Sequence, residues 1–299
     1  MEQTSFIWKN GEFIEWEHAT THLLTHSLHY GGAAFEGIRC YKTAKGTALF
    51  RLKEHIERLF YSASILQMDI PYTQEKIQKA CVDTVKKNNL SAGYIRPLIY
   101  FGYGKMGLNP KGAPVDTAIA CWQWGQYLGD EIVDLKTSKY MRVHPKATVC
   151  DAKLSGNYVN SILASLEVVG TKYHEALFLD VYGNVAEGPG ENIFIVKNSA
   201  LVTPPSGTIL LGITRDTVFQ IARAQNIQCA EKQLKIEDIY SADEAFFTGT
   251  AAEITPIKSL DDRIIGNGAL GAMTATIKNA FQNITNGKDK TFERFLTYV

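Results

Sequence analysis

Three short segments rich in glycine and threonine follow a lysine motif, and any fold of this chain must bring these pieces together. The lysine is Lys153, in Asp151-Ala-Lys-Leu-Ser-Gly-Asn-Tyr158. The segments are Glu187-Gly-Pro-Gly-Glu-Asn192, Gly212-Ile-Thr-Arg215 and Gly249-Thr-Ala-Ala-Glu-Ile-Thr-Pro256. A deprotonated lysine amine attacks aldehydes, and glycine-rich turns present backbone N–H groups to anions. With a glutamate, these are the parts needed to hold a phosphorylated pyridine aldehyde.

Composition limits the classes of protein that fit this chain. Its 299 residues, 45% hydrophobic and 21% charged, suffice for one large globular domain or two ordinary ones. The 31 basic and 31 acidic residues cancel, so no basic excess points to nucleic acid. No apolar run is long enough to span a bilayer, and no signal-peptide core lies near the N-terminus. We therefore expect neither a nucleic-acid partner nor a membrane partner.

Cysteine and histidine spacing gives no disulfide or metal motif. The cysteines are scattered, odd in number and without a C-x-x-C pair, which predicts reduced thiols in a cytoplasmic protein: Cys40, Cys81, Cys121, Cys150 and Cys229. Four histidines would share one face of a helix and suggest a metal, but their threonine-rich, β-prone neighbours argue against a helix: His18, His22, His26 and His29. We expect no metal site.

The first half of the chain predicts strand pairs and two helices. Asn10-Gly11 lies between two apolar segments and favours a type I′ hairpin turn. Apolar residues recur at helical spacing from Ile56 to Leu66. The predicted strands are 6–9, 12–16, 37–41, 48–51, 94–100 and 117–122, and the predicted helices are 56–66 and 74–88.

A change in composition near residues 125–130 predicts a connector to a second domain. Beyond it, Gly156 opens a helix that Gly170 ends, and Thr214 is a good N-cap for another helix. The predicted strands here are 176–181, 192–196, 245–247 and 253–257, and the further helices are 216–225 and 271–282. We predict a two-domain α/β (α+β) protein, with domains at 1–123 and 131–299 and a connector at 124–130.

In order and spacing, the quoted motifs resemble the fold-type IV pyridoxal-phosphate enzymes, and within them the branched-chain amino-acid aminotransferases. The resemblance runs from about Ile7 to about Gly266 and includes Tyr30-Gly-Gly-Ala-Ala-Phe-Glu-Gly-Ile-Arg39 upstream of the lysine. It implies pyridoxal 5′-phosphate bound in a cleft between a smaller N-terminal and a larger C-terminal domain. It also implies reversible transamination of leucine, isoleucine and valine with 2-oxoglutarate, in a homodimer at least.

The resemblance assigns a cofactor role to each motif. Lys153 matches the Schiff-base lysine and the acid–base group, and Tyr158 matches the partner of the cofactor's phenolic oxygen. Glu187 matches the carboxylate that keeps the ring nitrogen protonated, which leaves Glu191 and Asn192 as supports of their turn. The residues expected at the phosphate are Arg58, Gly212, Ile213, Thr214, Gly249 and Thr250.

A second set of residues matches the family's substrate pocket. Aromatic positions line the pocket for the branched side chain, and Arg96 matches the arginine that receives the distal carboxylate of glutamate. Tyr94 and Arg96, two apart on one strand, are expected on the same face. The loop at 105–110 matches one that a neighbouring subunit contributes. The full set is Tyr30, Phe35, Gly37, Tyr94, Arg96, Met106, Trp124, Tyr127, Thr250 and Ala251.

Two kinds of alternative stay open at this point. Within the same fold, the chain could be a D-amino-acid transaminase, an (R)-amine transaminase or an aminodeoxychorismate lyase; Arg96 and the segment 37–41 favour the branched-chain enzyme. Outside catalysis, it could be a non-catalytic pyridoxal-phosphate-binding protein. The complete set of Lys153, Tyr158 and Glu187 argues against that alternative.

Overall fold

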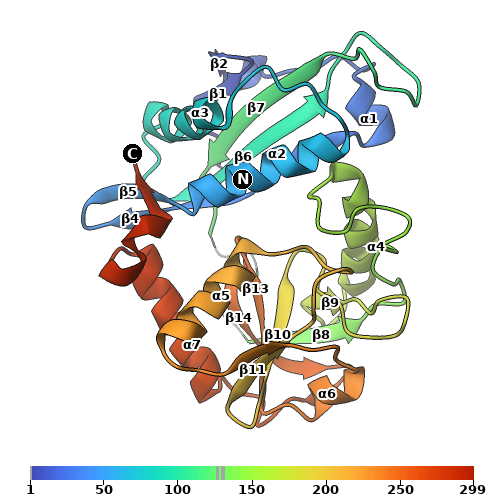
Figure 1. The fold of residues 1–299 in the computed structure, drawn as a ribbon, viewed down its shortest axis with the longest axis vertical. Coiled ribbons are helices and arrows are strands. Elements are labelled where there is room, and N and C mark those ends of the chain that lie inside the picture. Colours follow the sequence, from blue (N-terminus) through green and yellow to red (C-terminus); the bar gives the residue numbers. More distant parts are fainter. Residues whose placement is uncertain (1, 126–127, 129–131) are drawn as a thin grey trace. The chain divides into compact units, whose positions relative to one another are not determined.

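The computed structural model of this chain describes all residues except 1, 126–127 and 129–131. It divides into two compact units (Figure 1). Unit 1 comprises Met1–Gly125, Ala152–Gly156 and Ile284–Val299, and unit 2 comprises Gln126–Asp151 and Asn157–Asn283. The predicted connector at 124–130 lies largely outside the described residues.

Unit 1 is built on one antiparallel sheet with the strand order β16-β5-β4-β6-β7-β1-β2, and β3 pairs with β6 in addition. The hairpin turn between β1 and β2 is confirmed, because Asn10 and Gly11 both have positive φ, at 48° and 100°. The strands are β1 (Phe6–Lys9), β2 (Glu12–Glu15), β3 (Ala33–Phe35), β4 (Ile38–Thr43), β5 (Gly46–Phe50), β6 (Gly93–Phe101), β7 (Val115–Trp122) and β16 (Leu296–Tyr298).

Two long helices of unit 1 pack on each other and on this sheet, α2 (Leu52–Ile65) and α3 (Gln74–Lys87) (Figure 1). In α2, Ile56, Leu59 and Ala63 of the residues at helical spacing are fully buried and form the packing face, whereas Phe60, and Leu66 directly after the helix, are half-buried. Thr73 caps α3 by accepting a hydrogen bond from the Lys76 N–H. The short helices are α1 (His26–Tyr30), η1 (Trp16–His18), η2 (Ser155–Asn157) and η3 (Lys290–Phe295).

Unit 2 contains a second, mixed sheet with the order β12-β11-β10-β13-β14-β8-β9, and β15 pairs with β14. Its core is formed by apolar residues of these strands, among them Ile193, Phe247 and Ile257. The strands are β8 (Val133–Thr137), β9 (Glu175–Leu177), β10 (Asn192–Lys197), β11 (Ala200–Thr203), β12 (Cys229–Glu231), β13 (Glu244–Gly249), β14 (Glu253–Leu260) and β15 (Arg263–Ile264).

The helices of unit 2 are α4 (Tyr158–Val168), α5 (Ile213–Ala224) and α6 (Ile236–Tyr240); α7 (Ala272–Thr285) lies in it except for its last two residues. A smaller apolar cluster packs beneath α4 and includes Ala164, Phe178 and Ile209. In the described part of the chain, no helix has both the length and the apolar character needed to cross a bilayer. All five cysteines are free thiols.

The units differ from the predicted domains in two places. The segment Ile284–Val299 belongs to unit 1, because β16 pairs antiparallel with β5. The segment Ala152–Gly156, which carries the lysine, also clusters with unit 1, because Leu154 bridges to Ala34 of β3. Both pairings join residues far apart in sequence, and no local pattern signals them.

Candidate active site

Lys153 is held by backbone contacts to unit 1. Its N–H donates to Ser62 Oγ at 2.8 Å, and its carbonyl oxygen accepts from the Phe35 N–H at 3.2 Å. Its ammonium nitrogen Nζ lies 4.8 Å from the centre of the Phe35 ring. The side chain therefore lies beside Phe35, one of the predicted substrate residues.

The Phe35 ring joins Lys153 to Arg96. The guanidinium carbon of Arg96 lies 4.9 Å from the centre of the Phe35 ring, close to the 4.8 Å of Lys153 Nζ. Contacts of this kind are attractive for a cation. Two predicted functional groups, an amine and a guanidinium, thus share one aromatic neighbour.

Further aromatic rings lie close to Arg96. Its guanidinium lies 5.4 Å from the Tyr94 ring and 5.7 Å from the Trp122 ring. Nη2 of Arg96 donates to Tyr94 Oη at 3.5 Å, which confirms the expected common face. Trp124 packs edge-on against Tyr94 with ring centres 4.8 Å apart. Trp122 is a member of this group that the sequence did not single out.

Gly37 allows this packing, and Arg96 keeps an unused donor. A Cβ atom at Gly37 would lie 1.7 Å from Tyr94 Oη, so a larger residue would displace that ring. Among the described residues, the buried Nε of Arg96 has no hydrogen-bond partner. A buried donor without a partner is costly, so the Arg96 Nε is suited to donate a hydrogen bond to a bound ligand.

Arg58 is fixed by a buried ionic cluster on α2. Its Nε and Nη2 donate to the two carboxylate oxygens of Glu36, at 2.6 and 2.9 Å. His55 Nδ1 lies 2.7 Å from the same carboxylate. Burial would raise the pKa of Glu36, but Arg58 and His55 outweigh it and hold that pKa well below the usual range. Burial lowers the pKa of His55, so this imidazole is neutral and donates its Nδ1 proton to an ionised Glu36.

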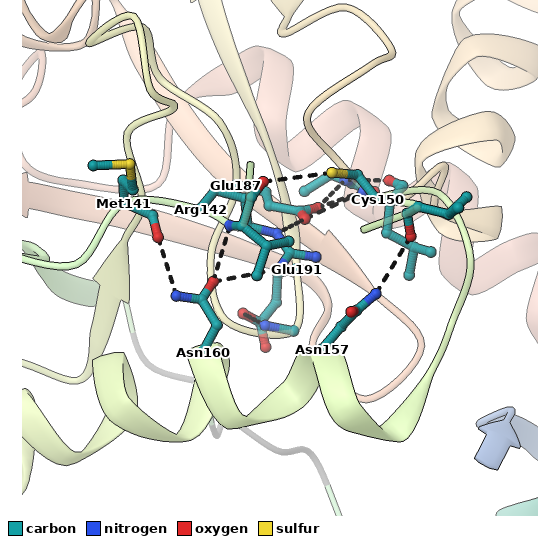
Figure 2. Close-up of polar contacts among 12 residues, drawn as sticks. Met141, Arg142, Cys150, Asn157, Asn160, Glu187 and Glu191 are labelled. Atoms are coloured by element: carbon teal, nitrogen blue, oxygen red, sulfur yellow. Dashed lines mark hydrogen bonds and ion pairs between the residues drawn. The ribbon is translucent and has the colours of Figure 1, made fainter. Parts of the chain in front are cut away.

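In unit 2, Glu187 is buried in the turn that precedes β10. Asn192 Nδ2 donates to its Oε2 at 3.0 Å, and the Leu210 N–H lies 3.2 and 3.1 Å from its two oxygens. Arg142 Nε donates to Oε1 at 2.6 Å (Figure 2). Arg142 is a partner that the sequence analysis missed.

The turn at 210–212 is tied to Glu187 through Asn192. Asn192 Nδ2 also donates to the Leu210 carbonyl oxygen at 2.8 Å, and a Cβ atom at Gly212 would lie 2.1 Å from Asn192 Oδ1. Gly212, not Thr214, is the N-cap of α5, and no side chain caps this helix end. The prediction of Thr214 as N-cap is therefore wrong: the close approach of Asn192 requires a glycine, and the helix begins earlier than predicted, at Ile213.

The third glycine-containing segment, which begins at Gly249, lies beside the turn that carries Glu187. Asn192 at the start of β10 pairs with Thr248 near the end of β13. A Cβ atom at Gly249 would lie 3.3 Å from the Gly190 carbonyl oxygen. The half-buried Thr250 and Ala251 form the turn from β13 to β14. The structure thus brings the turns around Glu187, Gly212 and Gly249 together, as the sequence predicted.

The remaining predicted site residues have fewer contacts to the groups described above. Tyr158 is the first residue of α4. Tyr30 and Met106 are exposed by 43% and 41%, and His26 links their segments: its ring packs on Tyr30, and its Nε2 lies 2.9 Å from the Gly107 carbonyl oxygen. Tyr127 lies outside the described residues. No group of histidine, cysteine or acidic residues in the described ranges is arranged to hold a metal.

Each unit, taken by itself, holds groups of a kind that suits pyridoxal phosphate. The uncapped N-terminus of α5 offers backbone N–H groups to a phosphate. In the same unit, the ion pair with Arg142 keeps Glu187 an anion, which suits a protonated ring nitrogen. Lys153 supplies an amine for the aldehyde. These chemistries match the group that the sequence motifs imply.

Comparison with known proteins agrees with the fold. Residues 33–260 match the model of the family described as amino-transferase class IV. The chain belongs to this family, and it has the fold-type IV architecture that the sequence resemblance implied.

The chain is also similar to individual members of this family. The chain is similar to a branched-chain-amino-acid aminotransferase of Pseudomonas aeruginosa, with 43% identity over 100% of this chain and 98% of the relative. It is also 42% identical to that of Escherichia coli (strain K12), over 96% of this chain and 95% of the relative. A crystal structure of the T.th. branched-chain amino acid aminotransferase with N-(5′-phosphopyridoxyl)-L-glutamate superposes with a TM-score of 0.96, at 41% identity, over 100% of this chain and 99% of that one.

Three residues of this site escaped the sequence analysis for different reasons. Glu36 lies inside the segment quoted at 30–39, and His55 lies directly before the predicted helix 56–66. His55 and Arg58 are three apart on α2, a spacing that places them side by side. Arg142 lies 45 residues from Glu187 in a segment without a motif. Only the tertiary fold reveals its role.

Proposed function

We propose that this chain is a pyridoxal-phosphate-dependent aminotransferase that exchanges amino groups between leucine, isoleucine or valine and 2-oxoglutarate. The products are the branched 2-oxo acids and glutamate. The observation that carries the proposal is the cluster at Phe35, where Lys153 Nζ lies 4.8 Å and the Arg96 guanidinium 4.9 Å from one ring. The amine of Lys153 can react with the cofactor's aldehyde, and the guanidinium of Arg96 can bind a carboxylate. Both lie beside an apolar surface that fits a branched side chain.

Lys153 is the catalytic group in this proposal. When bound, pyridoxal phosphate supplies the aldehyde that takes up the amino group and the ring that spreads the charge left on the substrate's Cα. Lys153 Nζ tethers the resting cofactor, removes the proton from Cα and returns it on the cofactor side. The Phe35 ring, 4.8 Å from Nζ, shields this amine from water on one side.

The other residues bind the cofactor and the substrate and orient them. Glu187 holds the proton on the ring nitrogen, and Tyr158 donates to the phenolic oxygen. Arg58, held by Glu36, and the N-terminus of α5 with Gly212, Ile213 and Thr214 bind the phosphate, together with Gly249 and Thr250. Ala251 completes the substrate pocket.

Absorbance spectra test the proposed function most simply. The purified protein with pyridoxal phosphate should absorb as a yellow, lysine-bound cofactor, and addition of L-leucine alone should convert this band to that of the amine form. Subsequent 2-oxoglutarate should restore it. A protein that binds the cofactor but does not respond to L-leucine would be a binding protein and not a transaminase.

Arg96 should matter more for glutamate than for leucine. Arg96→Ala removes a charge-assisted pair with the distal carboxylate, worth about 1.5–3 kcal/mol, while the apolar contacts to leucine remain. The half-reaction with glutamate should weaken about ten- to a hundred-fold more than that with leucine. Single-turnover spectra with each amino acid measure the two separately. Equal losses would show that Arg96 is structural or binds the α-carboxylate that both substrates share.

The assembly is a homodimer at least, in which the loop 105–110 reaches the pocket of a neighbour. An exposed apolar face on α4 supports an interface between copies. It comprises Val159, Ile162, Leu163 and Leu166 of the helix and Val169 directly after it, exposed by 58, 56, 38, 61 and 71%. Soluble monomers rarely expose contiguous apolar surface of this kind.

Charging this face should separate the subunits. The double variant Ile162→Glu/Leu166→Glu places two carboxylates in the apolar face, so it should shift the mass in solution from at least twice 33.2 kDa towards a single chain. Activity should fall with it. Asn279→Glu on the exposed side of α7 is the control, because it adds charge outside the apolar face. A wild-type protein that is monomeric and fully active at low concentration would contradict the dimer.

The free thiols and the small-molecule substrates support a cytoplasmic location. The partners in this proposal are amino acids and 2-oxo acids, without nucleic acid or membrane.

A further inference from the structure

Arg142 is a buried, charged partner of Glu187. Only 7% of its surface is exposed, and its Nε donates to Glu187 Oε1 at 2.6 Å. Burial alone would lower the pKa of this guanidinium, but the charge of Glu187 and the hydrogen bond to it outweigh burial and raise that pKa. The pair is therefore a buried ion pair in which both partners are charged.

Asn160 of α4 makes hydrogen bonds to Arg142 and to the residues on either side of it (Figure 2). Its Oδ1 accepts from the Val143 N–H at 3.2 Å and from Arg142 Nη1 at 3.4 Å, and its Nδ2 donates to the Met141 carbonyl oxygen at 3.0 Å. One amide thus holds the backbone on both sides of Arg142 as well as its side chain. The Arg142 N–H donates to the Leu179 carbonyl oxygen at 2.8 Å.

The same loop is tied to the start of α4. Asn157, directly before Tyr158, accepts from Thr148 Oγ1 at 2.8 Å and donates to the Val149 carbonyl oxygen at 3.3 Å. The loop 141–150 is therefore bound to α4 at two points, one turn apart (Figure 2). Through Arg142 it links the helix that begins with Tyr158 to the turn that carries Glu187.

We infer that Arg142 is a positioning residue that acts on the cofactor through Glu187. It holds the carboxylate ionised and in one orientation relative to α4, so that the ring nitrogen is bound in its protonated form. This inference rests on the proposed function, because it assumes that Glu187 faces the cofactor ring. An arginine is suited to the role because its fork binds the carboxylate and Asn160 at the same time.

A double-mutant cycle on cofactor affinity tests the inference without any measurement of turnover. Apoprotein is titrated with pyridoxal phosphate for the wild type, Arg142→Met, Glu187→Gln and the double variant. If Arg142 acts through Glu187, Arg142→Met should raise the dissociation constant about ten-fold or more, about 1.4 kcal/mol, only when Glu187 is present. In the Glu187→Gln background the same change should have little effect.

A cofactor analogue and two further variants separate positioning from folding. With 1-deazapyridoxal phosphate, whose ring has no nitrogen to protonate, Arg142→Met should change affinity little. Arg51→Met is the matched control: Arg51 is 6% exposed and pairs with Glu54 at 2.8 Å, so its loss should lower stability but not cofactor affinity. If Arg142→Met does not fold, Arg142→Lys enters the cycle, since it keeps the charge but loses the fork.

The possible results distinguish this inference from the proposed function. If Glu187→Gln leaves affinity and spectrum unchanged, or the wild type binds no cofactor, the role of Glu187 in the proposed function is wrong and the inference falls with it. If Glu187→Gln weakens binding but the losses for Arg142 and Glu187 simply add, only the inference is overturned. Equal weakening with the deaza analogue would overturn it as well.

Discussion

Lys153→Ala should abolish the covalent cofactor label and nearly all turnover. Lys153 is expected to serve as tether and as proton carrier, and a positioned proton-transfer group alone contributes about 10²–10⁴-fold to rate. The fold should survive, because the Ser62 contact of residue 153 is made by its backbone N–H and the Phe35 contact by its carbonyl oxygen. Borohydride reduction of the holoprotein followed by peptide mapping locates the label.

A control lysine makes this test specific. Lys146 is exposed and lies upstream in the loop before Lys153, so Lys146→Ala should keep both label and turnover. Finding the pyridoxyl label on any lysine other than Lys153 would remove the residue on which the proposed chemistry depends.

Glu187→Gln should leave a protein that still binds cofactor through the phosphate contacts but reacts slowly. The amide cannot keep the ring nitrogen protonated, so the half-reaction with leucine should slow by about 10²–10³-fold, the size typical of a lost electrostatic contact to developing charge. Stability should also fall by about 3–5 kcal/mol, because Arg142 is left buried without its anion. Stopped-flow spectra and thermal unfolding measure the two effects.

Glu175 provides the control for this variant. It is 3% exposed, compared with 4% for Glu187, and lies on β9. Glu175→Gln should affect stability but leave the half-reaction rate unchanged. If Glu187→Gln transaminates at the wild-type rate, another group must keep the ring nitrogen protonated.

Local sequence signals predicted the elements that depend on local physics. Asn10-Gly11 predicted the hairpin because both residues tolerate positive φ, and the spacing of Ile56 and Leu59 predicted the buried face of α2. The expectation that the glycine-containing turns lie near one another came from the cofactor site that they resemble and not from a local signal. The start of α5 was misplaced, since the tertiary contact of Gly212 with Asn192 outweighs the capping preference of Thr214.

What the sequence could not predict are the contacts between distant segments. Nothing near Leu296 indicates that β16 pairs with β5, and nothing near Arg142 indicates a partner at Glu187. The same holds for Glu36, whose charge is satisfied by two residues of α2. Charged residues are usually solvated, so a buried ion pair becomes visible only when the fold is known.

We expect this chain to transaminate branched-chain L-amino acids with 2-oxoglutarate. The most direct measurement is a kcat/KM panel in which the purified holoprotein is given 2-oxoglutarate and each of L-leucine, L-isoleucine, L-valine, D-alanine and an (R)-amine, with glutamate formation as the readout. We predict glutamate from all three branched L-amino acids, each at a kcat/KM well above those of D-alanine and the amine. Preference for D-alanine or the (R)-amine, with little glutamate from L-leucine, would contradict the claim.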